Sequence, residues 1–411
     1  MNRVIYVLWM AYASTYLLRK PVTLIKSDIL ASGQASSPTL LSLLDAAFLV
    51  PYACVQFIAD AVIDARGAWK VLQWSCGLAS ASGMVLVLVA RSAMDRGALW
   101  ALVAAQAASA GCVSLAWPAV CRIVSKGGAG GGTRDDGVQN AFRFLGTSAY
   151  VGAFAATFVA VRVREWFGWW NVFPICSALC FVATLMCWTV ARVDDGTNLD
   201  VKKKGKEEDF RKKTGNSMAL TLVAYGSFFT KMRFAVYLWL PSCLHHTLGL
   251  DAETAGALSA TVEAGGAVGA WLLGNTGDSA LRTCSLCSLA AGGAISLLAA
   301  AAAGAAPGGD PLVVAVLVAA FGVLNSGVDA VLSGAVAADV GAVGFVNGVG
   351  FLGAVAEAPV MALVMSVWEW NGFFACVAGA AVMAAVALWR AHVVVSSEAP
   401  AAAAVMRSSH K

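Results

Sequence analysis

The stretch that decides the fold reads AYASTYLLRKPVTLIK at residues 11–26, where two adjacent cations, Arg19 and Lys20, interrupt an apolar helix. An arginine near the centre of a bilayer costs at least ~2.5–3.5 kcal/mol on insertion scales, so it normally faces a cavity or a partner. Its guanidinium group keeps its charge at any physiological pH. We therefore interpret Arg19 as a cation that binds an anion.

The composition around this stretch is that of a membrane protein. Of the 411 residues, 59% are hydrophobic and only 13% are charged, and the mean hydropathy is +0.73. A helix needs about 20 largely apolar residues to span a bilayer, and roughly twelve such runs fit between Arg3 and Val394. This pattern excludes a soluble protein over most of the length. It predicts an all-α polytopic membrane protein with about 12 transmembrane helices.

A charged segment divides the chain. Residues 194–217 have no apolar period, and their cations alternate with acids: Lys202, Lys203, Lys204, Lys206, Arg211, Lys212 and Lys213. We expect a cytosolic linker there, between six-helix bundles at 1–193 and 218–395, with a cytosolic tail at 396–411. Orientation follows Lys and Arg in short loops. Both termini are therefore expected in the cytosol.

The two expected bundles carry an internal repeat. Residues 11–14 read AYAS shortly before Arg19, and residues 224–227 read AYGS shortly before Arg233. Arg19 precedes Asp64 by 45 residues (64 − 19), and Arg233 precedes Asp278 by the same interval (278 − 233). Six-helix halves related by an axis along the membrane normal are the plan of major facilitator transporters, which this chain resembles.

Helical spacing places hydrogen-bonding groups beside the arginines. Tyr12, Tyr16 and Arg19 fall on one face of the first helix, and Arg233 and Tyr237 fall on one face of the seventh. The planar fork of an arginine matches the oxygens of a phosphate bidentately. The spacing therefore favours a phosphate or a similar anion as ligand. In the fifth helix, Asn140 and Arg143 share a face in the same way.

A structural role for these cations stays open. Arg19 could instead pair with an intramembrane carboxylate, and four are available: Asp45, Glu263, Asp329 and Glu357. For Lys20 the sequence leaves two roles open: a contact with substrate, or an ion pair with a carboxylate, preferably Glu263, that breaks when substrate arrives. For Glu357 and Asp329 the sequence leaves packing and function equally open.

More specific motifs resemble the organophosphate:phosphate antiporter family. Tyr16-x-x-Arg19-Lys20-Pro21-x-x-x-x-Lys26 resembles the first-helix motif of that family, and its Arg-Lys-Pro form resembles the sugar-phosphate exchanger and glycerol-3-phosphate permease branch. Asp64 with Arg66-Gly67 and Lys70 resembles the cytosolic loop signature of the wider major facilitator superfamily. Further segments similar to the antiporter family are Trp117-Pro118 with Arg122, Asn140 with Gly146, Arg233 with Trp239 and Pro241, Asn347 to Ala354, and Trp370 to Phe373. The likeness spans nearly all of the chain outside linker and tail.

The resemblance implies that Arg19 and Arg233 bind the substrate phosphate, with Tyr12, Tyr16 and Lys20 close by. We also expect substrate-binding positions at Arg143, Asn140, Tyr237 and Gln56. Glu263 matches the eighth-helix glutamate of that family, and we expect coupling or gating roles for Glu263, Asp64, Asp278 and Arg66. Three positions depart from the bacterial carriers, which have lysine at Gln56, histidine at Arg143 and aspartate at Leu238. The positive charge that is lost at Gln56 is balanced by the one gained at Arg143, so we still expect an anionic substrate. The identity of its organic part stays open.

The expected function is exchange of an organic phosphate, such as glycerol-3-phosphate or a hexose phosphate, for inorganic phosphate by alternating access. One alternative is a facilitator carrier for another organic anion, coupled to protons. Another is a sugar-phosphate sensor that does not transport. We expect no enzyme activity, no cofactor or metal, no nucleic-acid partner, and a monomer in the bilayer.

Overall fold

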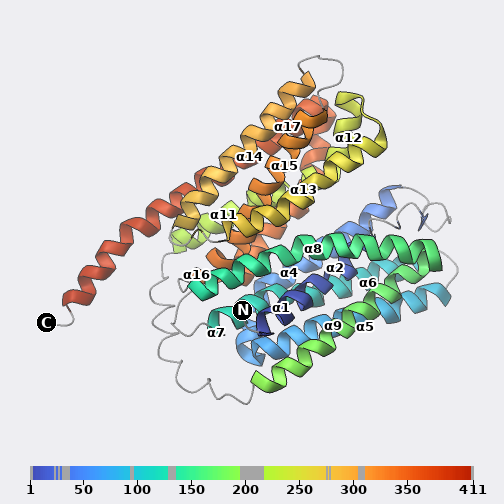
Figure 1. The fold of residues 1–411 in the computed structure, drawn as a ribbon, viewed down its shortest axis with the longest axis horizontal. Helices are drawn as coiled ribbons and strands as arrows, with labels where there is room; N and C mark the ends of the chain where they lie inside the picture. The colour runs from blue at the N-terminus through green and yellow to red at the C-terminus, as the bar shows by residue number, and fades with distance from the viewer. Residues whose placement is uncertain are drawn as a thin grey trace. The chain divides into compact units, whose positions relative to one another are not determined.

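The computed structural model describes residues 3–22, 25, 28–29, 38–92, 97–127, 136–194, 217–274, 276, 279–303 and 311–408. Within these ranges every regular element is a helix (Figure 1). The chain forms two compact units. The first comprises Met1–Lys203 with Val343–Phe351, and the second comprises Lys204–Ala342 with Leu352–Lys411.

The first unit is built from helices α1 (Arg3–Ser14), α2 (Tyr16–Arg19), α4 (Pro38–Arg66), α5 (Ala68–Ser92), α6 (Gly97–Val113), α7 (Ala116–Gly127), α8 (Asp136–Phe167), η1 (Trp169–Asn171) and α9 (Val172–Asp194). Helix α5 packs on α6 and α9, and α1 packs on α8. A Cβ atom at Gly152 of α8 would lie 2.6 Å from the carbonyl oxygen of Ala13. Glycine is therefore needed where α8 passes α1, the helix directly before the short helix α2 that carries Arg19.

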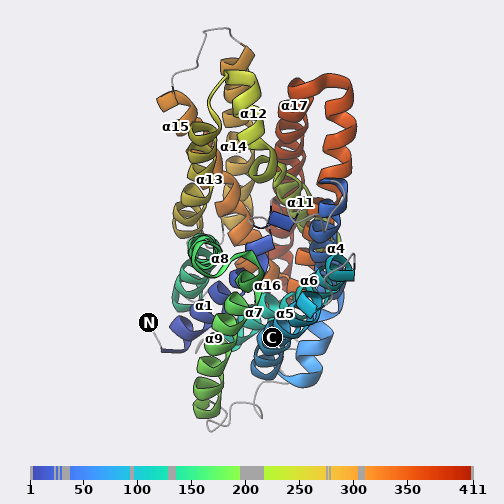
Figure 2. The ribbon, with the colours of Figure 1, turned by 90° about the vertical axis from the view of Figure 1, so that its right-hand side faces the viewer.

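The second unit contains α11 (Ser217–Met232), α12 (Ala235–Leu248), α13 (Ala252–Leu273), α14 (Ala280–Ala303), α15 (Pro311–Val331), the π-helix η3 (Leu332–Val336), α16 (Ala337–Asp339) and most of α17 (Val343–Ser408). Helices α13, α14 and α15 run side by side in both views (Figures 1 and 2). A Cβ atom at Gly265 of α13 would lie 2.6 Å from the carbonyl oxygen of Ala319 of α15. Small residues let these backbones approach closely.

Helix α17 is two helices that meet at a sharp break. Its 66 residues would extend about 100 Å as one rod, far more than the bilayer needs. Glu369 has φ 50° and ψ −138°, which no helix allows, so the chain bends there. The break separates the last two expected spans. The segment expected as a tail continues the second helix through Ser408.

Several of the expected spans are interrupted near polar residues. The first expected span, residues 3–26, is broken between α1 and α2 at Thr15. The fourth, residues 99–124, is broken between α6 and α7, and the seventh, residues 218–246, between α11 and α12 at Arg233. Around Arg233 the amides of Phe234 and Val236 donate three residues back, to Lys231 and Arg233. Irregular backbone at membrane depth is tolerated where it is buried in protein or lines a cavity. The two arginines singled out above both lie at or close to such a break.

Length and composition agree with the expected membrane spans. In the described ranges, seven helical segments are long and apolar enough to cross a bilayer. Each of the roughly twelve spans expected from the sequence contains a helix of the structure. The domain boundaries stay predictions, because residues 195–216 of the expected linker lie outside the described ranges.

Candidate functional site

Arg19 lies in a cluster of aromatic rings within the first unit. Its guanidinium carbon is 4.7 Å from the ring centre of Tyr52, 4.9 Å from Tyr16, 5.5 Å from Phe48 and 5.8 Å from Tyr12. Nη2 donates to the hydroxyl of Tyr52 at 3.1 Å. The buried Nε finds no hydrogen-bond acceptor among the described residues. The rings stabilise the cation through their π faces, and one of its donors stays available.

The break at Thr15 and helix α4 together build this cluster. The Thr15 hydroxyl donates to the carbonyl of Tyr12 at 2.7 Å and caps the end of α1. The expected face of the first helix is then present, with Tyr12 and Tyr16 both against Arg19. Phe48 and Tyr52 stand one turn apart on α4 and stack 5.6 Å apart.

Gln56 lies one further turn along α4 and has a clear structural partner. Its side chain is fully buried, and Nε2 donates to the carbonyl oxygen of Ser114 at 2.8 Å. Ser114 stands at the break between α6 and α7, where a carbonyl lacks its helical partner. The other amide atom of Gln56, Oε1, has no partner among the described residues. A substrate contact of Gln56 stays a prediction.

The other expected binding residues of the first unit occupy more peripheral positions. Lys20 is half-buried directly after α2, and Arg143 is half-buried on α8. Asn140 is exposed one turn before Arg143. Their contacts with substrate, and the pairing of Lys20 with Glu263, stay predictions.

Arg233 is completely buried in the second unit, with an exposed fraction of 0%. Nη2 donates to the hydroxyl of Thr230 at 3.2 Å and to the hydroxyl of Ser288 at 3.4 Å. Nε and Nη1 have no acceptor within the described part of the chain. Burying a charge is costly unless it is paired and hydrogen-bonded. The arrangement is suited to an anion that accepts from these two nitrogens.

The carboxylate that acts electrostatically on Arg233 is Asp329, and it is engaged elsewhere. Lys231 Nζ lies 2.5 Å from Asp329 Oδ1, with side-chain exposures of 3% and 14%. Asp329 is therefore largely neutralised by a cation other than Arg233. The sequence left open whether Asp329 serves packing or function. The ion pair shows that Asp329 is the counter-ion of Lys231.

Further polar groups of the second unit come from α12 and α15. The hydroxyl of Tyr237 lies 2.5 Å from that of Ser326. Asn325 has an exposed fraction of 0%, and its amide lies at the hydroxyl of Tyr237. A buried amide normally has its hydrogen bonds satisfied. Asn325, Tyr237 and Ser326 therefore form one polar cluster of the second unit.

The expected coupling residues are placed as follows. Glu263 is half-buried on α13, and Arg66 is exposed at the end of α4. Asp64 forms an ion pair with Arg122, and Asp278 lies outside the described residues. One turn before Asp64, the carboxylate of Asp60 accepts from the amide of Gly344 at 2.9 Å.

Glu357 is the most buried carboxylic acid that the described ranges contain, with 2% exposure. It accepts a hydrogen bond from Nε1 of Trp239 at 3.0 Å. Within those ranges, no group of three His, Cys, Asp or Glu side chains is placed to hold a metal ion.

Sequence reasoning missed Phe48, Tyr52, Lys231 and Asn325. The spacing of Phe48, Tyr52 and Gln56 at intervals of four is a signal that could have revealed the aromatic face of α4. Lys231, two residues before Arg233, is also a cation in an apolar run. Nothing local identifies Asp329 as its partner 98 residues away.

Comparison with known proteins identifies the family. The family model described as Major Facilitator Superfamily matches residues 8–341. A search of the curated proteins finds no match. Among solved structures, the proton:xylose symporter XylE bound to 6-bromo-6-deoxy-D-glucose has a TM-score of 0.70 and 16% identity over 94% of this chain and 95% of its own. A bacterial homologue of the iron transporter ferroportin, in an outward-facing state, has a TM-score of 0.69 and 12% identity over 95% and 99%. These likenesses show the fold, and the match to the family model shows that the chain belongs to the Major Facilitator Superfamily.

Proposed function

We propose that this facilitator exchanges an organic phosphate, such as glycerol-3-phosphate or a hexose phosphate, for inorganic phosphate. The observation that carries the proposal is Arg233, wholly buried with Nε and Nη1 lacking acceptors among the described residues. A phosphoryl group supplies both the negative charge and the paired oxygens that a guanidinium fork accepts. The first-helix motif around Arg19 adds the resemblance to organophosphate antiporters.

In this proposal the two units contribute different parts of substrate recognition. A bound anion would stabilise Arg233 more than Arg19, because the hydrogen-bond partners of Arg233 are neutral hydroxyls. Arg19 has one unoccupied donor, surrounded by tyrosine rings whose hydroxyls can bond the organic part of the substrate. Tyrosine combines an apolar ring with a polar tip, which suits a sugar or glycerol.

Exchange follows from the same electrostatics. A carrier without substrate keeps an only partly compensated charge at Arg233, so its reorientation is disfavoured. Bound phosphate or organic phosphate removes that penalty and favours the occluded state on the reorientation path. Movement of one anion inward is then tied to movement of another outward. The helix breaks at Thr15 and Arg233 provide places where the backbone can adjust.

Counterflow tests this function directly. Purified protein in proteoliposomes loaded with unlabelled phosphate is given external radiolabelled phosphate, and then a panel of organic phosphates and carboxylates as competitors. We expect internal phosphate to accelerate uptake, and organic phosphates to compete while carboxylates do not. Uptake that ignores internal phosphate, or competition by carboxylates alone, would contradict organophosphate exchange. Ligand binding without any counterflow would support the sensor alternative.

A proton-coupled carrier for another organic anion is the second candidate, and Glu357 favours it. This carboxylic acid is 2% exposed on α17, where the ionised form is costly. Protonation of Glu357 would remove that cost, and transport would then be coupled to the binding of a proton at Glu357. An imposed pH gradient should then drive uptake without internal phosphate, and Glu357→Gln should abolish the gradient's effect. Gradient-independent uptake in the wild type would exclude this candidate.

The orientation and assembly also belong to the proposal. We place both termini in the cytosol, because the Lys- and Arg-rich segment at 194–217 follows the positive-inside rule. We propose a monomer as the transport unit. Protease protection of tags at each end, and light scattering of the purified protein, check these two points.

A further inference from the structure

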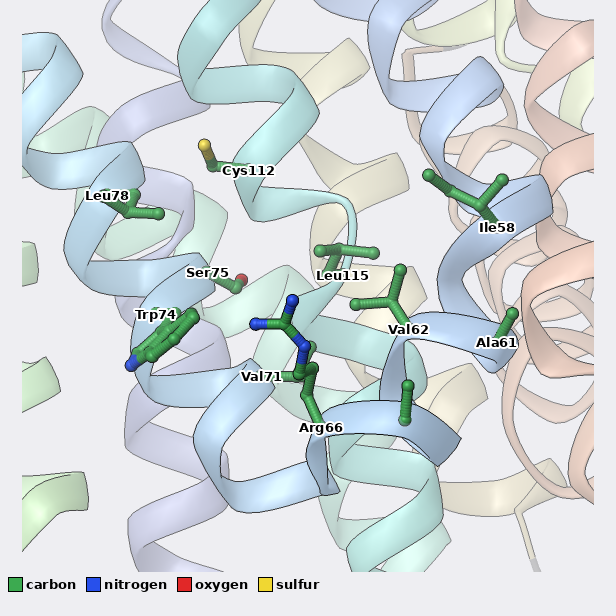
Figure 3. A pocket seen from close by; sticks show the side chains of 11 residues that line it. Ile58, Ala61, Val62, Arg66, Val71, Trp74, Ser75, Leu78, Cys112 and Leu115 are labelled. Atoms are coloured by element: carbon green, nitrogen blue, oxygen red, sulfur yellow. The ribbon is translucent and has the colours of Figure 1, made fainter.

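A groove in the first unit shares no residue with the clusters around Arg19 and Arg233. Eleven residues from α4, α5 and the α6–α7 region line it (Figure 3). Its cavity of about 450 Å³ falls within the range of small-molecule sites, roughly 300–1,000 Å³. All but two of the lining side chains are apolar, and the two polar ones are Arg66 and Ser75.

The apolar walls of the groove are open rather than sealed in the core. Ile58 of α4 is 55% exposed, and Trp74 and Leu78 of α5 are 54% and 57% exposed. Ile58 belongs to the segment Leu43–Arg66, which is long and apolar enough to cross a bilayer. Along a membrane-spanning segment, exposed apolar side chains are solvated by lipid chains. The groove therefore opens onto a surface where acyl chains are the expected solvent.

The polar end of the groove lies where α4 ends. Arg66 is the last residue of α4, and Figure 3 shows its side chain reaching into the groove between Trp74 and Leu115. Within the described residues its guanidinium makes no hydrogen bond or ion pair, while the neighbouring Asp64 is paired with Arg122. Ser75, the other polar residue of the lining, is 3% exposed.

The groove has a charged end and an apolar end. From Val71, next to the α4–α5 turn, to Leu78 the groove follows α5 over seven residues, roughly 10 Å of helix. Arg66 stands at the helix end, where a membrane protein meets the headgroup region. A ligand that fits must carry an anionic group at one end and an apolar chain at the other.

We propose that the groove binds one anionic phospholipid, with its phosphate on Arg66 and an acyl chain between α4 and α5. The guanidinium fork matches two phosphate oxygens. The apolar walls give the acyl chain a contact that a soluble phosphate cannot use. The site differs from the proposed transport site in its position and in its exposed apolar walls, so it stands whether or not the transported substrate is an organic phosphate.

Native mass spectrometry of the detergent-purified protein tests this site. Phosphatidylglycerol is added stepwise, with phosphatidylcholine as the neutral comparison. We expect one phosphatidylglycerol to be retained per chain in preference to phosphatidylcholine. Arg66→Gln should lower the affinity for phosphatidylglycerol about fivefold, as expected for one cation near anionic headgroups. Lys70→Gln, which removes an exposed cation outside the lining, is the matched control and should change it little.

A second variant tests the acyl-chain part while the charge is kept. Ala61→Phe places a ring in the groove, and Ala46→Phe adds the same ring at an exposed position of α4 outside it. Only Ala61→Phe should reduce retention. Equal retention by wild type, Arg66→Gln and Ala61→Phe would overturn the proposal. So would displacement of the lipid by inorganic phosphate, or loss of a dimer in Ala61→Phe with lipid binding unchanged.

Discussion

Arg19 lies among four aromatic rings, whereas Arg233 lies against the hydroxyls of Thr230 and Ser288 and keeps two nitrogens without acceptors in the described ranges. The π faces stabilise Arg19 whether or not an anion is present. Neutral hydroxyls satisfy only part of the charge on Arg233. Two arginines at equivalent places of a repeat can therefore differ in role. A bound anion would stabilise Arg233 most, whereas the surrounding aromatic rings already stabilise Arg19.

The largest expected effect concerns the other buried cation of the second unit. Lys231→Met leaves the partly buried Asp329 without its ion-pair partner, which should lower the free energy of unfolding by about 3 kcal/mol. Thermal unfolding in detergent measures it, with Lys70→Met at an exposed position as control. The double variant Lys231→Met/Asp329→Asn should regain most of the loss. A double variant no more stable than Lys231→Met would mean that Asp329 depends on Arg233, and the comparison above would fail.

The second-largest expected effect tests whether Arg233 binds the transported anion. Arg233→Lys keeps the charge and removes the fork, and the loss of charged hydrogen bonds, ~1.5–3 kcal/mol, should slow phosphate counterflow about a hundredfold. The initial rate is measured at matched protein insertion. Arg390→Lys, on the exposed side of α17, is the control and should transport normally. Unchanged counterflow in Arg233→Lys would remove it from the site.

A smaller loss is expected for the aromatic cluster. Arg19→Lys should insert normally yet slow counterflow severely, by about tenfold, because an ammonium group keeps the cation–π contacts and loses the fork. The ratio of the two arginine-to-lysine effects measures the difference between the sites. Wild-type exchange by Arg19→Lys would end its assignment as a phosphate ligand.

The smallest effect concerns a single hydroxyl. Tyr52→Phe keeps the ring and removes the acceptor for Arg19 Nη2, a hydrogen bond worth about 1 kcal/mol, so the affinity for substrate should change about fivefold at most. Competition of organic phosphates in counterflow measures the change. Tyr6→Phe, at an exposed tyrosine, should change nothing. A loss as large as that of Arg19→Lys would mean that the hydroxyl, rather than the ring, supports the cation.

Much of the architecture could be predicted from the sequence, because helical periodicity is local. The predicted all-α major facilitator fold is confirmed, and the described ranges contain seven helical segments long and apolar enough to cross a membrane. The shared face of Tyr12, Tyr16 and Arg19 follows from spacing alone, and these side chains do lie together. The organophosphate branch and the roles of individual residues stay predictions.

The tertiary structure alone decided which groups meet across helices. The pairs Lys231 with Asp329 and Trp239 with Glu357 join distant helices, and so do the rings of α4 around Arg19. Such contacts depend on the rotation and depth of each helix, which are set by close approaches such as Gly152 to Ala13 and Gly265 to Ala319. The sequence by itself determined that charged groups lie within membrane-spanning helices and which neighbours share their face. Packing between helices determined which charges are neutralised and that Arg233 keeps two donors for a ligand.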